Sequence, residues 1–375
     1  MFSALLRHRP RSVAAVSLLA LAVAVGACGT SNSSSSKSST SSGGGSSASG
    51  GTVGLLLPET KTTRYEAFDH PLFAKQLKTL CASCKLLYAN ANQDAAQQQS
   101  QADSMLTQGV KVLVLDPVDG KAAQAIVTKA KAQNIPVVSY DRLASGPIDY
   151  YVSFDNNRVG QLQGTALLKQ LSKGGNPKRG PIVMIDGSPT DPNAGDFKKG
   201  AHSALDGQVT IGKEYDTPDW TPDKAQTEAQ AAITALGGSK IIGWYSANDG
   251  MAGGIAAAIQ QAGIKPFPPL TGQDAELAGI QRIVAGQQTM TVYKAIKPEA
   301  DAAAGMAVAL LQGKPYPQAT ATQNNGTADI KSQLLTPVEV TASNIKSTVV
   351  ADGFYTVKQI CTAQYAAACK KIGLQ

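Results

Sequence analysis

Planar polar side chains follow many of the strands that this 375-residue sequence predicts. A carboxylate accepts hydrogen bonds at two oxygens, an amide both donates and accepts, and a guanidinium offers a rigid fork of donors. Adjacent sugar hydroxyls each donate and accept, so such side chains can bridge them in pairs, while an aromatic ring can pack on the apolar C–H face. The residues concerned are Arg64 and Tyr65, Asp141 and Arg142, the loop 187–193 that ends in Asn193, Trp220, Asn248 and Asp249, Gln273 and Asp274, and Lys294.

These side chains have an alternative interpretation as parts of turns and helix caps. Asp and Asn after a strand commonly form turns and N-caps, and Asp249, which precedes Gly250, fits a cap better than a ligand. Trp244 and Tyr245 lie inside a predicted strand and are expected in the core. In parallel α/β sheets, however, ligands bind outside the carboxyl ends of the strands. Seven polar sites that converge at such an edge therefore favour a binding pocket over unrelated turns.

Motifs for other chemistry are absent from the sequence or incomplete in it. There is no Walker phosphate loop, no Gly-x-Gly-x-x-Gly after the first strand and no Gly-x-Ser-x-Gly elbow. The segment 116–120 faintly resembles a calcium loop but lacks its spacing and its terminal Glu. Spacing alone leaves open a carboxylate pair for glycoside hydrolysis, yet most strand-end acids stand beside Arg, Asn or Gln, which suits hydrogen bonding better than proton transfer. We therefore expect a binding protein with no catalytic residue, no cofactor and no metal site.

Short β-rich runs alternate with longer helical patterns from Thr52 onward. Such alternation predicts parallel sheets covered by helices on both faces, and the chain is long enough for two α/β domains, the first ending near Phe154. The predicted strands are Val53–Leu57, Leu86–Ala89, Val112–Leu115, Val137–Tyr140, Tyr151–Phe154, Ile182–Ile185, a strand near Ile211–Tyr215, Ile241–Tyr245, Met290–Tyr293 and Leu334–Val340. The predicted helices are Ala95–Gln108, Lys121–Gln133, Asn157–Leu171, Pro222–Leu236, Met251–Ala262 and Pro298–Leu311.

The amino-terminal residues have the composition of an export signal. Arg7, Arg9 and Arg11 precede an apolar stretch, 12–25, that is too short to span a membrane comfortably. The following Val-Gly-Ala-Cys at 25–28 resembles a bacterial lipoprotein box, in which Cys28 receives the lipid; the alternative is an ordinary signal peptide with a chance cysteine. The Ser/Gly-rich segment 29–51 cannot bury apolar surface and is expected to be a disordered tether. These features predict a signal peptide over 1–28 and a lipid-anchored protein facing outward.

The net charge gives no reason to expect a nucleic-acid partner. The full chain carries a formal charge of +7, and without the three arginines of the leader 31 basic groups face 27 acidic ones. No run of five or six basic residues could track a phosphate backbone.

Four cysteines remain beyond the lipoprotein box, and an even number outside the cell favours disulfides. The local pairs Cys81–Cys84 and Cys361–Cys369 are the simplest of three possible connectivities. Cys81 and Cys84 could instead form a redox motif or half a zinc site. No second pair stands at zinc spacing, and the chain has only three histidines, so structural disulfides are the favoured interpretation.

Several motifs in the right order resemble the type I periplasmic sugar-binding proteins and, within them, the D-xylose-binding branch that serves ABC importers. The resemblance extends from Val53 to Phe354. The motifs that carry it are 140–142 (Tyr-Asp-Arg), 151–156, 187–189 with 193–194, 248–254, 272–275, 288–294, 324–326 and 334–337.

This resemblance implies an α/β fold of two doubly wound parallel-sheet lobes joined by a three-strand hinge, with crossings near Asp155, Gln273 and Pro337. The lobes would comprise 52–154 plus 275–325 and 155–273 plus 337–375, and they would close on a monosaccharide, most simply D-xylose. The implied partners are an ABC permease and, through Cys28, the membrane, with the protein a monomer. The implied sugar contacts are Arg64, Tyr65, Asp141, Arg142, Asn193, Trp220, Asn248, Asp274 and Lys294.

The sequence departs from the D-xylose-type pattern at two places near the expected site. Tyr65 stands where that pattern has a Trp, and Pro192 interrupts the loop before Asn193. The smaller ring at Tyr65 could admit a larger sugar, so glucose, arabinose and ribose remain alternatives. A sensory receptor would use the same pocket. A regulator of the LacI type shares the fold, but here the lipoprotein box and tether occupy the place of its DNA-binding segment.

Overall fold

The computed structural model describes residues 50–375. The predicted signal peptide 1–28, the lipidation site Cys28 and the tether up to residue 49 lie outside the described residues. In the part of the chain that is described, no helix is both long and apolar enough to cross a bilayer.

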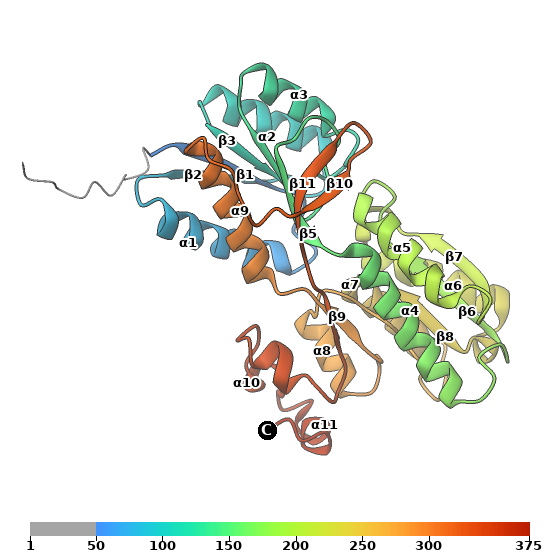
Figure 1. The fold of residues 1–375 in the computed structure, drawn as a ribbon. Coiled ribbons are helices and arrows are strands. Elements are labelled where there is room, and N and C mark those ends of the chain that lie inside the picture. The colour runs from blue at the N-terminus through green and yellow to red at the C-terminus, as the bar shows by residue number, and fades with distance from the viewer. Residues whose placement is uncertain (1–49) are drawn as a thin grey trace, which may run out of the picture. The chain divides into compact units, whose positions relative to one another are not determined.

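Residues 52–154 together with 321–335 build a seven-stranded sheet (Figure 1) with the order β10-β11-β5-β4-β3-β1-β2. All neighbouring strands are parallel except β10 and β11, which are antiparallel. The strands are β1 (Thr52–Leu57), β2 (Lys85–Asn90), β3 (Val112–Leu115), β4 (Val137–Tyr140), β5 (Tyr150–Phe154), β10 (Ala321–Asn324) and β11 (Asp329–Leu335).

The apolar runs in this sheet form strands because both faces are covered. Successive side chains of a strand point to opposite faces, and β1 accordingly buries Val53, Leu55 and Leu57 in one core and Leu56 in another. The first core lies against α1 (His70–Leu80) and α9 (Ile296–Leu311), and the second against α2 (Ala95–Thr107) and α3 (Gln124–Ala132). The carboxyl ends of β3, β4 and β5 therefore lie in a rigid frame that positions the residues following them.

A third core surrounds the three-stranded parallel sheet β7-β6-β8. It buries the aromatic side chain of Trp244 and the apolar faces of helices on both sides of the sheet, with α4 beside α5 and α6 beside α7 (Figure 1). Its elements are α4 (Asn156–Lys173), β6 (Pro181–Asp186), α5 (Pro192–Leu205), β7 (Thr210–Asp216), α6 (Pro222–Leu236), β8 (Gly243–Ser246) and α7 (Asp249–Gln261).

A fourth, smaller core lies beneath the two-stranded antiparallel sheet of β9 (Thr291–Tyr293) and β12 (Val338–Val340). It packs α8 (Leu277–Val284) against the carboxyl-terminal segment, which contains the π-helix Lys346–Val350, α10 (Val357–Ile360) and α11 (Ala366–Lys371). Disulfides join Cys361 to Cys369 within this segment and Cys81 to Cys84 at the end of α1, which are the two local pairs expected from spacing.

The predicted elements agree with the structure where the hydrophobic pattern is strong, as for Val112–Leu115, Val137–Tyr140 and Pro222–Leu236. The single strand predicted over Leu334–Val340 is wrong, because β11 ends at Leu335 and β12 begins at Val338 in a different sheet. Pro337 stands at this break, where it has no N–H to donate to a ladder. The helices α1, α5, α8, α10 and α11 and the strand β10 were not predicted.

The fold is the expected one of two α/β lobes, but the contacts suggest a different second crossing. The expected boundary placed 275–325 with the first lobe, whereas α8 and β9 pack with the carboxyl-terminal segment. Only from α9 onward does the chain return to the first sheet. We therefore propose crossings at residues 155, 294–296 and 336–337, with 297–335 in the first lobe and 275–293 in the second.

Candidate functional site

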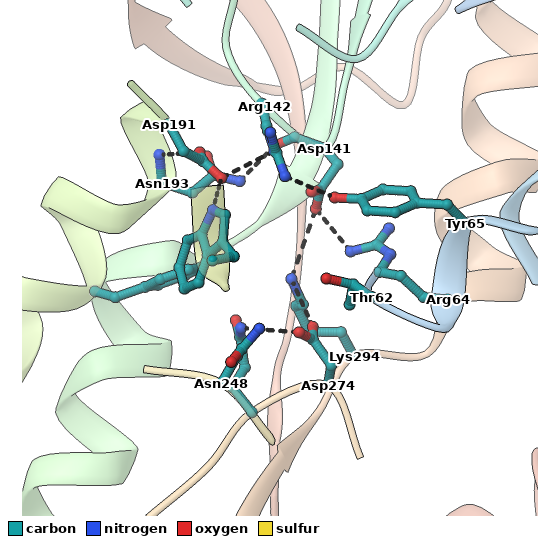
Figure 2. Close-up of a pocket in the computed structure, with 13 residues that line it drawn as sticks. Thr62, Arg64, Tyr65, Asp141, Arg142, Asp191, Asn193, Asn248, Asp274 and Lys294 are labelled. Atoms are coloured by element: carbon teal, nitrogen blue, oxygen red, sulfur yellow. Dashed lines mark hydrogen bonds and ion pairs between the residues drawn. The ribbon is translucent and has the colours of Figure 1, made fainter. Parts of the chain in front are cut away.

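All nine residues predicted as ligands line one cavity, which Figure 2 shows in close-up. The lining side chains are Thr62, Arg64, Tyr65, Asp141, Arg142, Asp191, Asn193, Phe197, Trp220, Asn248, Gln273, Asp274 and Lys294.

Arg64 is the most heavily bonded cation of the cavity. Its Nε and one Nη2 hydrogen form a fork to the two oxygens of Asp69 at 3.0 and 2.7 Å, and Nη2 also lies 2.6 Å from Glu299. Its Nη1 donates to Asp141 Oδ1 at 2.9 Å. Burial by itself lowers the pKa of this guanidinium, but the carboxylates Asp141, Asp69 and Glu299 outweigh it and raise the pKa well above its ordinary value. Arg64 is therefore a fixed positive charge in the cavity wall.

Asp141 presents its carboxylate beside two cations at the end of β4. Its backbone has a φ of 53°, a left-handed conformation that non-glycine residues adopt infrequently, and its carbonyl accepts a hydrogen bond from Tyr151 Oη at 2.9 Å. Burial opposes ionisation of this carboxyl, but Arg64 and Lys294 outweigh burial and lower its pKa. Asp141 is thus an ionised double acceptor held in position from behind.

Arg142 links the two halves of the cavity wall (Figure 2). Its Nε forms an ion pair with Asp191 at 2.9 Å and lies 3.7 Å from Asp116, while its Nη2 donates to Tyr65 Oη at 3.2 Å. Asp116 follows β3 in the first lobe, whereas Asp191 precedes α5 in the second. One guanidinium therefore bonds to side chains of both lobes.

The amino-terminal end of α5 places an amide at the cavity. Asp191 caps the helix by accepting from the backbone N–H of Asn193 at 2.9 Å, as short polar side chains do at the N-cap. Asn193 Nδ2 then reaches across to the carbonyl of Asp141 at 3.0 Å. Pro192, the departure from the D-xylose-type pattern, occupies the first turn of this helix, where its missing N–H costs nothing.

Two aromatic rings form the apolar part of the cavity. Phe197 lies one helical turn after Asn193, and its ring meets that of Trp220 edge to face with centroids 6.2 Å apart. Trp220 has a φ of 55°, and its Nε1 donates to Asp191 Oδ2 at 3.1 Å. A Cβ at Gly187 would lie 2.0 Å from the Trp220 ring, so glycine is required there for the indole to reach the cavity.

The remaining polar residues come from three segments: Asn248 follows β8, Gln273 and Asp274 lie between α7 and α8, and Lys294 follows β9. Asn248 Oδ1 caps α7 by accepting from the N–H of Met251 at 2.9 Å, and Gln273 Nε2 donates to Asp274 Oδ2 at 3.3 Å. Lys294 Nζ lies 3.2 Å from Asp274 and 3.7 Å from Asp141. Burial lowers the pKa of this ammonium, but the two carboxylates outweigh it, so the pKa is raised and the group is charged.

Several polar atoms at the cavity have no hydrogen-bond partner in the described part of the chain. They include Arg142 Nε, Asp274 Oδ1 and Gln273 Oε1, all on residues that are at most 8% exposed. Arg142 Nε and Asp274 Oδ1 do form ion pairs, with Asp191 and Lys294 respectively, but neither makes a well-aligned hydrogen bond there. Because an unsatisfied buried polar atom is costly, these atoms suit a ligand with several hydroxyl groups.

Four lining residues were not predicted as ligands: Thr62, Asp191, Phe197 and Gln273. Asp191 and Gln273 stood in predicted strand-end segments, so the position after a strand was the available signal for them. Phe197 could have been found from its i, i+4 spacing to Asn193 on one helix face. Nothing in the local sequence singles out Thr62. Across residues 50–375, no group of three or more His, Cys, Asp or Glu side chains could hold a metal ion.

A family model described as a periplasmic binding protein domain matches residues 53–315. The chain belongs to this family. Proteins with similar sequences include the D-xylose-binding periplasmic protein of Escherichia coli, which is 38% identical to this chain over 82% of this chain and 92% of that protein. The multiple sugar-binding periplasmic receptor ChvE of Rhizobium radiobacter is 33% identical over 83% of this chain and 92% of its own length.

Solved structures of solute-binding proteins also share the fold. A solute-binding protein of an ABC transporter from Clostridium phytofermentans, solved with bound β-D-glucose, superposes with a TM-score of 0.77 at 28% identity and covers 82% of this chain and 99% of its own. A carbohydrate transporter solute-binding protein from Chloroflexus aurantiacus, in complex with D-glucose, gives a TM-score of 0.75 at 29% identity, covering 82% of this chain and 97% of its own. These relatives are solute-binding proteins and not enzymes, as expected from the residues at the strand ends.

Proposed function

We propose that this chain captures a monosaccharide outside the cytoplasm and delivers it to an ABC importer as a monomeric lipoprotein. The observation that carries the proposal is the cavity itself, which is lined by ionised and amide side chains from both lobes and by the aromatic rings of Phe197 and Trp220. Hydroxyl groups pair with planar acceptors and donors, and a pyranose C–H face packs on an aromatic ring. The nine predicted residues serve as the sugar contacts in this proposal.

D-xylose is the proposed sugar, supported by the 38% identity to a D-xylose-binding protein. The test is calorimetric titration of the detergent-solubilised full-length chain with D-xylose, D-glucose, L-arabinose and D-ribose. One-to-one binding of D-xylose with the tightest affinity is expected. Tighter binding of another of these sugars would retain the class and refute the specificity, and the absence of heat with all four would refute the proposed function.

A second candidate is a sensory receptor of broader sugar specificity, which the similarity to a multiple sugar-binding receptor favours. A binding protein for import should be required for growth on its sugar, whereas a receptor should be required only for the response to that sugar. Deleting the chain in its own host and measuring sugar uptake separates the two, because unchanged uptake would favour the receptor.

The lipid anchor on Cys28 is part of the proposal and is supported by the small residues at 25–27 and the Ser/Gly-rich stretch after the cysteine. Cys28→Ser should release the protein from the membrane fraction and abolish incorporation of radiolabelled palmitate. Continued labelling of this variant would contradict the anchor.

A further inference from the structure

Asp249 lies just behind the cavity and was interpreted from the sequence as a helix cap. The structure gives the capping role to Asn248, whose Oδ1 accepts from the N–H of Met251. Asp249 is instead the first residue of α7, it is fully buried, and it does not line the cavity. Its carboxylate therefore needs another explanation.

Three donors from three different segments converge on this carboxylate. Gln288 Nε2 donates to Oδ1 at 2.6 Å, Thr291 Oγ1 donates to Oδ2 at 2.8 Å, and the backbone N–H of Glu276 donates to Oδ2 at 2.9 Å. Thr291 Oγ1 in turn accepts from the N–H of Ala275 at 3.1 Å. Asp249 thus ties the amino-terminal end of α7 to the segment 273–276 and to β9.

Two glycines make room for this arrangement. A Cβ at Gly272 would lie 2.0 Å from Asp249 Oδ1, and one at Gly279 would lie 2.3 Å from Oδ2. Real Cβ atoms do not approach so closely, so both positions exclude any other residue while the carboxylate keeps its place. The surrounding backbone therefore packs closely around this carboxylate and leaves no space for a side chain at either glycine.

Each segment that Asp249 joins carries a cavity residue next to the joint. Asn248 precedes Asp249 in the chain, Asp274 lies two residues before Glu276, and Lys294 follows β9. We propose that Asp249 is a positioning residue for sugar binding, which fixes Asn248, Asp274 and Lys294 relative to one another. This inference rests on the proposed function, because it assigns a role in the same sugar site.

The ionisation of Asp249 gives this role a signature. Burial raises the pKa of its carboxyl to about 7, against the opposing effects of Arg282, Gln288 and Thr291, and nearby Asp274 adds to the rise. The backbone N–H of Glu276 bonds to Asp249, and burial together with the nearby Asp249 carboxyl raises the pKa of the Glu276 side chain to about 8. The ionised carboxylate accepts all three bonds, whereas a protonated carboxyl must turn one O–H toward a donor.

The central experiment compares sugar affinity of full-length wild type and Asp249→Asn between pH 6 and 8 by calorimetry. The wild-type affinity should fall about fivefold as the pH is lowered, because protonation disrupts the joint. Asp249→Asn should bind about tenfold more weakly at pH 8 and show a flatter profile than wild type, in which only the contribution of Glu276 is left. Equal affinity of the variant, or an unchanged pH profile in it, would overturn the inference.

Asp186 provides a matched control, since it is a buried carboxyl with a pKa raised to about 7 by burial, and its ion-pair partner is Lys198. It does not line the cavity. Asp186→Asn should keep the wild-type pH profile of binding. Loss of the profile in this control would assign the pH effect to the second lobe in general and would count against Asp249.

Thr291 tests the joint independently if Asp249→Asn fails to fold. Thr291→Val removes the donor with little change of shape and should weaken binding about fivefold, whereas Thr291→Ser keeps the hydroxyl and should bind within about twofold of wild type. Equal affinities of the two variants would overturn the proposal. A wild-type protein that binds none of the sugars would instead refute the proposed function itself, and with it this inference.

Discussion

The two lobes line the cavity with different kinds of side chain. The wall from the first lobe is charged and contains Arg64, Asp141 and Arg142. The wall from the second lobe holds the carboxyl groups of Asp191 and Asp274 but no arginine, and it otherwise presents neutral groups, chiefly the amide of Asn193 and the indole of Trp220. Both walls are buried, with each of these residues at most 8% exposed.

The two walls differ in how many buried partners their polar groups require. A buried charge is tolerated only when it is paired and hydrogen-bonded, so Arg64 requires Asp69 and Glu299 behind it, and Tyr140 Oη donates to Asp69 in turn. A buried amide or indole needs only one or two bonds, such as that from Trp220 Nε1 to Asp191. The charged wall is thus part of the core of its lobe, while the neutral groups of the other wall can change with smaller consequences for folding.

Arg64→Ala should have the largest effect, because it takes the cation away from buried Asp69 and Glu299 and leaves Asp141 with Lys294 alone. We expect the free energy of unfolding to fall by about 3–5 kcal/mol, as for other broken buried pairs, and sugar binding to be lost. Urea denaturation and calorimetry measure the two effects. Arg64→Lys is the matched control that keeps the charge but not the fork, and it should lie between wild type and Arg64→Ala. Unchanged stability of the alanine variant would contradict the contrast between the walls.

Asn193→Ala should weaken sugar binding about tenfold and change the free energy of unfolding by no more than about 1 kcal/mol. Its stability effect is small because the Asp141 carbonyl keeps its bond from Tyr151 Oη when Asn193 Nδ2 is removed. Asn344, whose amide donates to the Glu339 carbonyl outside the cavity, offers a control whose substitution by Ala should leave affinity unchanged. If Asn193→Ala lost as much stability as Arg64→Ala, the contrast between the two walls would be refuted.

Glu299→Gln should have the smallest effect and sharpens the interpretation of the charged wall. Burial raises the pKa of Glu299 well above its ordinary value, with Asp141 and Asp69 adding to the rise and Arg64 opposing it. The carboxyl therefore stays neutral in the fold over a pH range in which it ionises in the unfolded chain. A group with a raised folded pKa contributes stability that is present below its unfolded pKa and is lost as the pH rises toward the folded value.

Because Gln does not ionise, the variant should match wild type within about 1 kcal/mol near pH 4.5. Its stability should then decline less steeply than that of wild type as the pH rises, and its affinity for sugar should stay within about threefold. Urea denaturation at several pH values between 4.5 and 8 provides the measurement. Parallel stability profiles for the two proteins would show that Glu299 is ionised in the fold and that the charged wall carries one more negative charge.

Much of the frame was predictable because its signals are local. The runs Val112–Leu115 and Val137–Tyr140 are apolar on both faces, which is typical of strands buried between helices, and the structure confirms both. The polar residues after such strands were expected to meet at one sheet edge, and all nine predicted residues do line one cavity. Periodicity failed where elements are short or interrupted, as for α8 and for the two strands on either side of Pro337.

By itself the sequence determined which residue types would stand at the strand ends, since the alternation of strands and helices brings those ends to a common edge. Only the tertiary structure decided which groups stabilise them. Arg64 pairs with Glu299, 235 residues away, and Asp249 bonds to Gln288 and Thr291 across two elements. Such pairings depend on how helices and loops dock after the sheets have formed, and hydrophobic periodicity carries no information about them. For that reason the cavity was foreseeable from the chain, while the buried groups that position its residues were not.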